Sequence, residues 1–286
     1  MRSTIIMMLL IIAACSAKAQ YYNDYSLYEK SVVFELGGSA GLMNCRADVG
    51  DTKTMMKNFK GSGGFYAGIM YKDFIGLRFQ ATWGSVAGQD STSKSVWAKT
   101  KRNLSFSSDI TEVALLAEIH PLVLFYDAQG SPRLSPYLAA GIGSFSFNPK
   151  TFYKGQWIYL QPLHLEGQGF KEYKARKTYK LSQFNIPVGG GLKFKISDLF
   201  TIRGEMIYRI LNTDYLDDVS TSYIDPSLFD KYLPEPQAFY AKQLYFRGDE
   251  VDPEAAQPKP GNRRGVKRNN DGYFTVNINL GITLGR

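Results

Sequence analysis

Residues Gly272–Arg286 read GYFTVNINLGITLGR and close the chain. From position 274 to position 284 the even positions hold Phe, Val, Ile, Leu, Ile and Leu, whereas the odd positions hold Thr, Asn, Asn, Gly and Thr. A period of two indicates a β-strand with one apolar face and one polar face. In a soluble sandwich the apolar face points toward a core, and in a membrane barrel it points outward into lipid. The rest of the chain has to decide between these two arrangements.

Strand-like segments recur along the whole chain. In one of them Ile75, Leu77 and Phe79 share a face, while Arg78 and Gln80 share the other. Most of these segments are longer than the usual soluble strand and match the length of a tilted membrane strand. We predict eight strands, at Ser31–Gly41, Ser62–Lys72, Phe74–Val86, Leu104–Ile119, Leu134–Phe147, Lys180–Ile196, Leu199–Leu211 and Tyr273–Leu284.

Short and long connections alternate between these strands. Lys72-Asp73 and Ser197-Asp198 are tight turns, and His120–Arg133 is of medium length, whereas the other connections are long. Outer-membrane barrels have short periplasmic turns and long outer loops, and a soluble sandwich has no reason to alternate in this way. The pattern therefore favours an all-β, eight-stranded antiparallel transmembrane β-barrel with long extracellular loops, and the apolar face of the final strand is expected to meet lipid.

The N-terminus reads as an export signal. Arg2 supplies a positive charge, Ile5–Ala14 is an apolar run too short to span a bilayer, and Ala17-Lys18-Ala19 offers a cleavage site. We expect residues 1–19 to be a cleaved signal peptide, residues 20–286 to form the barrel domain, and the protein to reside in the outer membrane. A lipoprotein signal that would lipidate Cys15 is the alternative.

The polar faces of the predicted strands carry charges of both signs. Eight strands leave an interior just wide enough for side chains, so these charges are expected to point inward, pair and fill the lumen. A wide aqueous pore is then not expected. The predicted lumen residues are Arg78, Glu112, Glu118, Lys193, Arg203, Glu205 and Arg209.

The last outer loop, Asn212–Asp271, is too long for a simple connection, so it is either functional or disordered. Asp225-Pro226 predicts a helix start, and Ala238–Phe246 predicts a second helix. Gly248–Asn270 is rich in Pro, Gly and charge, which predicts mobility.

An acidic cluster lies early in this loop. Asp214, Asp217 and Asp218, followed by Asp225, are its candidate interaction residues. Calcium would suit their oxygens, but their spacing matches no EF-hand, which favours a solvated or cap-forming turn over a metal site.

A basic run lies late in the same loop, at Arg263, Arg264, Lys267 and Arg268. Nucleic acid is not expected outside the cell. Lipopolysaccharide phosphate is the better anionic partner, and a plain mobile loop is the simpler interpretation.

The sequence indicates no catalytic, metal or cofactor site. His120 and His164 are expected on opposite sides of the membrane, so they cannot form a paired site. A Ser-His nucleophile at His164 lacks a serine and an acid at a suitable spacing. We therefore predict a protein that is not an enzyme and binds no cofactor, with a surface hydrolase using His164 as the weakest hypothesis.

Four stretches resemble a known family: RNLSFSSDITE (Arg102–Glu112), FNPKTFYKGQWIYLQPLHLEGQG (Phe147–Gly169), SQFNIPVGGGLKF (Ser182–Phe194) and TDYLDDVSTSYIDPSL (Thr213–Leu228). They are similar to the Bacteroidota family of outer-membrane barrels that includes PorG of the type IX secretion system. The resemblance implies a structural part of a complex for protein secretion and, in some species, gliding motility. Its implied partners are the periplasmic ring lipoprotein and that lipoprotein's own partner.

Two functional hypotheses follow. In the first, the periplasmic contacts of such a complex come from Tyr21–Lys30, Lys72-Asp73, His120–Arg133 and Ser197-Asp198. In the second, the protein is a stand-alone barrel whose long loops bind a surface ligand or lipopolysaccharide.

Overall fold

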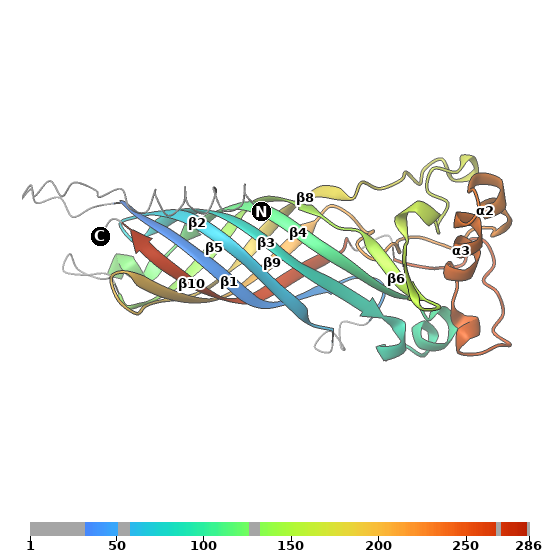
Figure 1. Ribbon diagram of the computed structural model, residues 1–286, viewed down its shortest axis with the longest axis horizontal. Coiled ribbons are helices and arrows are strands. Elements are labelled where there is room, and N and C mark those ends of the chain that lie inside the picture. Colours follow the sequence, from blue (N-terminus) through green and yellow to red (C-terminus); the bar gives the residue numbers. More distant parts are fainter. Residues whose placement is uncertain (1–31, 51–57, 126–131, 267–269, 285–286) are drawn as a thin grey trace, which may run out of the picture. The chain divides into compact units, whose positions relative to one another are not determined.

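The computed structural model describes residues 32–50, 58–125, 132–266 and 270–284. Eight long strands pair antiparallel in the order β3-β2-β1-β10-β9-β8-β5-β4, and pairing of β3 with β4 closes the sheet into a barrel (Figure 1). The predicted fold class is confirmed. The barrel strands are β1 (Val32–Arg46), β2 (Lys60–Tyr71), β3 (Ile75–Gln89), β4 (Ser105–Ile119), β5 (Leu134–Ser146), β8 (Ser182–Lys195), β9 (Phe200–Leu211) and β10 (Gly272–Leu284).

Two features of the sheet differ from the sequence-based prediction. Strand β1 was expected to end at Gly41, but its pairing with β10 continues to Arg46 opposite Gly272. The extension persists because Met43 and Cys45 point inward and are buried. The hairpin of β6 (Pro149–Tyr153) and β7 (Gln156–Tyr159), which pairs with β4 at Ser107 and Ser108, was missed.

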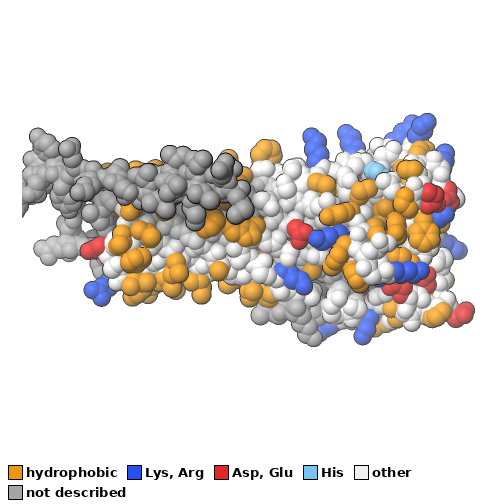
Figure 2. All heavy atoms as spheres, viewed as in Figure 1, with side chains coloured by type: hydrophobic (Ala, Val, Ile, Leu, Met, Phe, Trp, Pro, Cys, Tyr) orange, Lys and Arg blue, Asp and Glu red, His pale blue; other side chains and the backbone are white. Residues whose placement is uncertain are grey.

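The alternation seen in the final strand matches the two faces of the barrel wall. Val276, Ile278 and Leu280 are 44%, 60% and 61% exposed, whereas Asn277 and Asn279 are buried. The other strands repeat this pattern, so the barrel carries an outward apolar surface and a polar interior (Figure 2). An apolar exterior of this extent is suited to lipid and not to water.

The two ends of the barrel differ. One end has the tight turn after β2, the turn between β8 and β9, and the short 3₁₀ helix η4 (Pro121–Phe125), and short turns mark the periplasmic end of such barrels. At the other end lie the long loops, with α2 (Ser227–Tyr232) and α3 (Gln237–Leu244) (Figure 1). None of the described helices is long and apolar enough to cross a membrane.

The long outer loops pack into one structure, which we call the cap and define as residues 90–104, 147–181 and 212–266. Its apolar side chains, such as Phe170, Tyr223, Phe229 and Leu244, form one buried cluster with residues at the outer end of the barrel, including Phe145 and Tyr273. Side chains from three loops thus share a single hydrophobic core. The two predicted helices are confirmed, each within two residues of its expected position.

The predicted mobility of Gly248–Asn270 is wrong for its described part. Ala255 and Arg264 are buried, and a bridge joins Ser222 to Arg263. Composition suggested mobility, but one arginine that is buried and hydrogen-bonded fixes the segment. The predicted signal peptide, Cys15 and the contact segment Tyr21–Lys30 lie outside the described residues.

Candidate functional site: the filled lumen and the cap

The periplasmic third of the lumen is organised around Glu35 of β1. Its carboxylate pairs with Lys193 and with Arg203, whose Nη2 lies 2.8 Å from Oε2. The hydroxyls of Tyr66 and Thr201 donate to the same carboxylate at 2.8 and 3.1 Å. Each lone pair of a buried carboxylate needs such a donor, because the interior offers little water.

Tyr66 fits into this layer because two glycines leave it space. A Cβ at Gly37 would come within 2.5 Å of the Tyr66 ring, and a Cβ at Gly281 within 2.4 Å of its hydroxyl. Gly37 thus makes room for a side chain that crosses the lumen. Tyr66 and Tyr273 both point inward and are buried.

The middle of the lumen joins four strands, β3, β4, β5 and β9. Glu118 pairs with Arg78 at 2.8 Å and with Arg203 at 2.8 Å. Glu205 accepts from Arg78 and from the hydroxyl of Tyr137, both at 2.7 Å. Arg203 therefore bridges two layers, since it holds both Glu35 and Glu118.

The outer third of the lumen is closed by Arg209 and Glu112, which lie 2.8 Å apart. Arg209 also donates to the hydroxyl of Thr275 at 2.6 Å, and Asn185 donates to Glu112 at 2.7 Å. All seven lumen residues named from the sequence are thus placed inside the barrel, and the structure adds Glu35, Tyr66, Tyr137 and Asn185 to them.

Charge in the lumen is balanced. Four carboxylates, Glu35, Glu112, Glu118 and Glu205, contact four cations, Arg78, Lys193, Arg203 and Arg209. Each of these side chains is almost fully buried. Crossing ion pairs and tyrosine rings fill the space that an eight-stranded barrel leaves, so the lumen is a polar core.

His120 lies at the periplasmic end of the barrel beside a serine and an acid. Its Nδ1 lies 3.1 Å from Oγ of Ser135, and its Nε2 lies 3.6 Å from Glu118. The ring stacks on Tyr137 at 5.1 Å. In serine hydrolases Nε2 faces the serine and Nδ1 faces the acid, which is the reverse of this order. Ser135 is also only 4% exposed, so a substrate has no path to it. His120, Ser135 and Glu118 therefore serve to pack the periplasmic end of the barrel.

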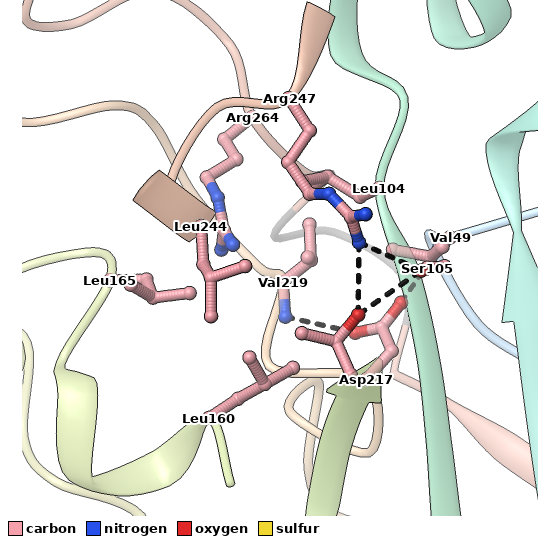
Figure 3. A pocket seen from close by; sticks show the side chains of 11 residues that line it. Val49, Leu104, Ser105, Leu160, Leu165, Asp217, Val219, Leu244, Arg247 and Arg264 are labelled. Carbon is pink, nitrogen blue, oxygen red and sulfur yellow. Dashed lines mark hydrogen bonds between the residues drawn. The ribbon is translucent and has the colours of Figure 1, made fainter. Parts of the chain in front are cut away.

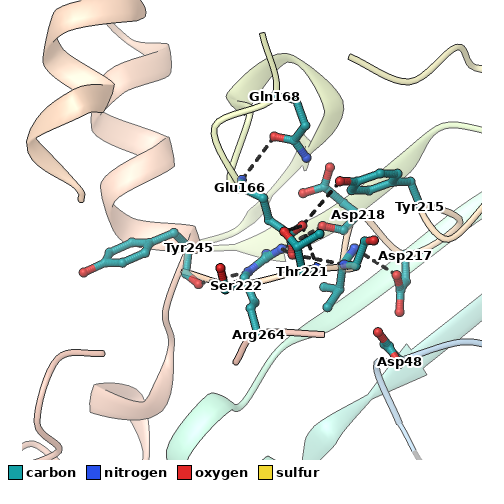
Figure 4. A network of polar contacts seen from close by, with 12 residues as sticks. Asp48, Glu166, Gln168, Tyr215, Asp217, Asp218, Thr221, Ser222, Tyr245 and Arg264 are labelled. Carbon is teal, nitrogen blue, oxygen red and sulfur yellow. Dashed lines mark hydrogen bonds and ion pairs between the residues drawn. The ribbon is translucent and has the colours of Figure 1, made fainter. Parts of the chain in front are cut away.

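Glu166 and Arg264 form the polar centre of the cap (Figure 4). The carboxylate of Glu166 accepts from the backbone N–H groups of Ser220 and Thr221 at 3.0 and 2.9 Å, and from Arg264 at 3.1 Å. Arg264 donates in turn to the carbonyl of Asp218 at 2.7 Å. This cluster ties the loop after β7 to both halves of the loop after β9.

A second buried arginine links the cap to β1 and β3. Arg102 makes two hydrogen bonds of 2.7 Å to Asp90 and donates to the carbonyls of Asp48 and Arg264. The paired geometry of an arginine fork on a carboxylate is strong and directional. Arg102 and Arg264 together hold four chain segments in one arrangement.

The acidic cluster of the last outer loop lies inside the cap. Asp217 accepts from the backbone N–H groups of Val49 and Val219, and Asp218 accepts from the hydroxyl of Tyr179. Of the two alternatives, a solvated or a cap-forming turn, the solvated one is wrong for both, because the loop folds over them. Asp217 does cap its own turn, through the N–H of Val219. Asp214 is also buried, whereas Asp225 is exposed and accepts from the N–H of Ser227 at the start of α2. Among the described residues, no group of three or more His, Cys, Asp or Glu side chains is arranged to hold a metal ion.

The basic run is also divided by the fold. Arg263 is exposed and lies over the ring of Trp97, whereas Arg264 is buried on Glu166. Lys267 and Arg268 lie outside the described residues. The run therefore does not present Arg264 to an external anion, because that side chain serves the interior of the cap.

A small cavity lies in the cap between Leu104, Leu160, Leu165 and Leu244, with Arg247 at its edge (Figure 3). Its volume is ≈ 10 Å³, which is about the space of a single water molecule. The cavity is therefore a packing defect and is too small for an organic ligand. His164 is half-buried in the cap and packs on Phe170 at 6.0 Å.

Residues 7–225 match a protein-family model. The match agrees with the structure, which is a closed eight-stranded barrel with an apolar exterior, a paired polar lumen and long outer loops. The matching model is the one described as outer membrane protein β-barrel domain. The chain belongs to this family. As a member of the outer membrane protein β-barrel family, it is a protein of the outer membrane.

Several solved barrels are similar to this family member. The N-terminal β-barrel domain of Pseudomonas aeruginosa OprF is 11% identical, with 89% of this chain and 98% of that chain covered and a TM-score of 0.34. Neisserial surface protein A is 10% identical, with coverages of 87% and 96% and a TM-score of 0.39. Ail of Yersinia pestis, solved with the heparin analogue sucrose octasulfate, is 10% identical, with coverages of 88% and 97% and a TM-score of 0.36. No curated protein matches the chain in sequence.

Sequence reasoning about this outer membrane protein missed Glu35 and the cap core. Glu35 could have been found, because it alternates with the apolar residues Phe34 and Leu36. The Glu166–Arg264 pair could not, because the two residues are far apart in the chain and neither lies in a periodic segment. Only packing of the loops brings them together.

Four buried aspartates in and next to the cap have raised pKa values. Burial raises the pKa of Asp214 to about 7 and that of Asp218 to about 7. Burial and then the charge of Asp48 raise the pKa of Asp217 well above its ordinary value, and burial and then Asp217 raise that of Asp271. The buried carboxyl groups in this region thus outnumber the two buried arginines, Arg264 and Arg102, that could pair with them.

We expect the cap of this outer membrane protein to be more stable at pH 5 than at pH 8. An aspartate with a raised folded-state pKa takes up a proton on folding, so its stabilisation is fully present below about pH 4 and is lost as pH rises through about 7. By this linkage, each of the two aspartates is expected to cost the cap about 2 to 3 kcal/mol of stability between pH 5 and pH 8. Urea titrations followed by tryptophan fluorescence would measure it, since Trp97 and Trp157 lie in the cap.

The matched variant for this experiment carries Asp214→Asn and Asp218→Asn. It should show a flatter pH profile, because neither amide titrates. A cap that gains stability from pH 5 to pH 8 would contradict the assignment.

Proposed function

We propose that this protein is a non-enzymatic structural component of a protein-secretion complex of the type IX kind, which in some species also serves gliding motility. The observation that carries the proposal is the double closure of the barrel, by ion pairs in the lumen and by the packed cap. A closed barrel acts through its surfaces. The four sequence stretches that resemble the Bacteroidota family including PorG support this particular complex.

The lumen also limits the role that the protein takes in secretion. Side chains occupy the interior, and an eight-stranded barrel is too narrow for a folded protein even without them. The secreted protein would therefore pass elsewhere in the complex. In this proposal the barrel serves as an outer-membrane attachment point.

The periplasmic end offers a surface for the proposed ring lipoprotein and its partner. Leu124 and Phe125 of η4 are 66% and 82% exposed, in the first half of the predicted contact segment His120–Arg133. The nearby turns include Lys72, Asp73 and Ser197. Exposed apolar side chains next to polar turns are typical of a protein contact.

A pull-down from the native outer membrane in mild detergent would test this function. We expect the tagged protein to recover the ring lipoprotein and secretion subunits, and we expect Leu124→Ser with Phe125→Ser to reduce that recovery at least about tenfold, because truncated apolar anchors are costly at an interface. The matched control is Phe152→Ser with Trp157→Ser on the outer hairpin, which should leave recovery unchanged. Recovery of the barrel without any ring component would argue strongly against the proposal.

A second candidate function is binding of a surface ligand or lipopolysaccharide by the long loops of a stand-alone barrel. The order of the cap favours it, because loops that are already fixed lose little entropy on binding. Deleting Gly248–Asn270 would be a poor test, since it removes Arg264 and with it the centre of the cap. Substitutions at exposed side chains keep the cap intact and are therefore preferable.

A further inference from the structure

The segment Lys171–Lys180 returns the chain from the cap to β8. Its exposed lysines recur every three residues, at Lys171, Lys174, Lys177 and Lys180, and we call these four the lysine ladder. Tyr173, Arg176 and Tyr179 alternate with them and turn toward the cap. The sequence KEYKARKTYK thus separates a charged outer side from an inner side with a period of three, which neither a strand nor an α-helix produces.

The inner side anchors the ladder firmly. Arg176 donates to the carbonyls of Glu166 and Ser222 at 2.8 and 2.9 Å. The Tyr179 ring stacks on Phe147 at 6.0 Å and on Tyr215 at 4.8 Å, and its hydroxyl donates to Asp218. The lysines therefore project from a fixed backbone.

No acid of the cap neutralises the ladder. Within the described ranges, none of its four ammonium groups forms an ion pair with a carboxylate, and Glu172, the one exposed acid between them, pairs with Lys231 at 2.6 Å. Four unpaired positive charges on one edge create a local attraction for anions. Figure 2 shows Lys and Arg side chains projecting from the edge of the cap along which this segment runs in Figure 1.

Exposed apolar side chains of the wall continue downward from the ladder. Phe184 and Ile186 of β8 are 80% and 51% exposed, and Ile142 and Leu138 of the adjacent strand β5 are 69% and 63% exposed. These four residues form an apolar panel that begins at Phe184 below the ladder and reaches down to Leu138, which lies opposite Gly190. A ligand seated here would meet cations above and hydrocarbon-like side chains below.

The height of the ladder matches the head-group layer. Four residues separate Lys180 from Phe184, which is about 13 Å along a strand and roughly 9 Å along the normal for a strand tilted near 45°. The polar layer of each leaflet is on the order of 5 to 8 Å thick. The backbone of Lys180 therefore lies at the outer edge of the polar layer, within reach of the phosphates for a long lysine side chain, and the other lysines reach above it.

We propose that the lysine ladder and the apolar panel bind lipopolysaccharide of the outer leaflet, with the ladder on its phosphate groups and the panel along its acyl chains. The inference deepens the surface-binding function above and rests on it for the class of ligand. The apolar panel selects an amphiphile over a free phosphate, because a soluble anion would leave Phe184 and its neighbours without a partner.

The test uses the full mature chain in detergent micelles, titrated with lipid A that carries its phosphates. Lys171, Lys174, Lys177 and Lys180 are changed together to Gln, and the control changes four exposed lysines elsewhere in the loops, Lys94, Lys99, Lys154 and Lys259, to Gln. Both variants lose the same charge. Heat-modifiable migration on gels checks that each barrel is folded.

We expect the ladder variant to bind lipid A at least about tenfold more weakly and the control within about twofold of the unaltered protein. Phosphate-free lipid A should bind the unaltered protein as weakly as the ladder variant binds lipid A, and added salt should remove the difference. Phe184→Ser should weaken binding of lipid A through the panel alone.

Equal affinity of the ladder variant and the control would overturn the inference. Competition by inorganic phosphate at concentrations equal to lipid A would overturn the choice of an amphiphile. If the cap binds another surface ligand but the ladder variant binds lipid A as well as the unaltered protein does, the inference fails and the surface-binding function stands. If no surface ligand binds, including lipid A, both fail.

Discussion

Replacing Arg203 by Met is expected to destabilise the folded barrel by about 3–5 kcal/mol. Arg203 contacts both Glu35 and Glu118, at 2.8 Å in each case. Its guanidinium also lies over the rings of Tyr66 and Tyr137. Without it, two buried carboxylates share only Lys193 and Arg78, so the lumen carries an excess negative charge that water cannot solvate.

Urea titration of the variant in detergent micelles, with heat-modifiable migration as a parallel measure of the closed barrel, would show this loss. Arg263→Met is the matched control, because Arg263 is exposed over Trp97 and the same substitution there should change the free energy of unfolding by less than about 0.5 kcal/mol. A loss below about 1 kcal/mol at Arg203 would mean that water or rearranged side chains compensate the carboxylates.

Replacing Arg264 by Met is expected to open the cap while leaving the barrel closed. Arg264 is buried, and it holds the carboxylate of Glu166, the carbonyl of Asp218 and the carbonyl of Tyr245. Removing one partner of a buried pair leaves an uncompensated charge, at a cost of about 3–5 kcal/mol.

Limited proteolysis and amide hydrogen exchange would separate the two parts of the molecule. The variant should be cleaved within residues 212–266 at least about tenfold faster than the unaltered protein, while exchange of the strand amides stays slow. The neighbouring Arg263→Met again serves as the control. Simultaneous loss of strand protection would show that cap and barrel unfold as one unit.

The strands could be predicted because their signal is local. Phe274 to Leu284 alternate by side-chain type, and the same period in Ile75–Phe79 and Phe184–Phe194 identified the lipid-facing positions before any pairing was known. Inward-facing charges such as Arg78 and Arg209 follow from the same alternation. The error at Gly41 arose at an end of the pattern, where pairing of β1 with β10 carries the strand further than its composition suggests.

The loops could not be predicted in this way. Pro, Gly and charge made Gly248–Asn270 look mobile, and spacing made Asp217 and Asp218 look solvated, yet these segments are packed on Tyr179, Glu166 and Val49 from other loops. Such contacts join residues far apart in the chain, and no periodic pattern in the sequence indicates them. The helix start near Asp225 was predictable because a cap and a proline act over a few residues.

By itself, the sequence determined the number of barrel strands, the face of each that meets lipid and the charges that face inward, because an alternation of period two can be read from neighbouring residues. Only the tertiary structure decided which charges meet, such as Glu35 with Lys193 and Arg203, and which loop residues become a core. Closure of β3 on β4 sets those distances, and the burial that follows turns isolated charges into pairs.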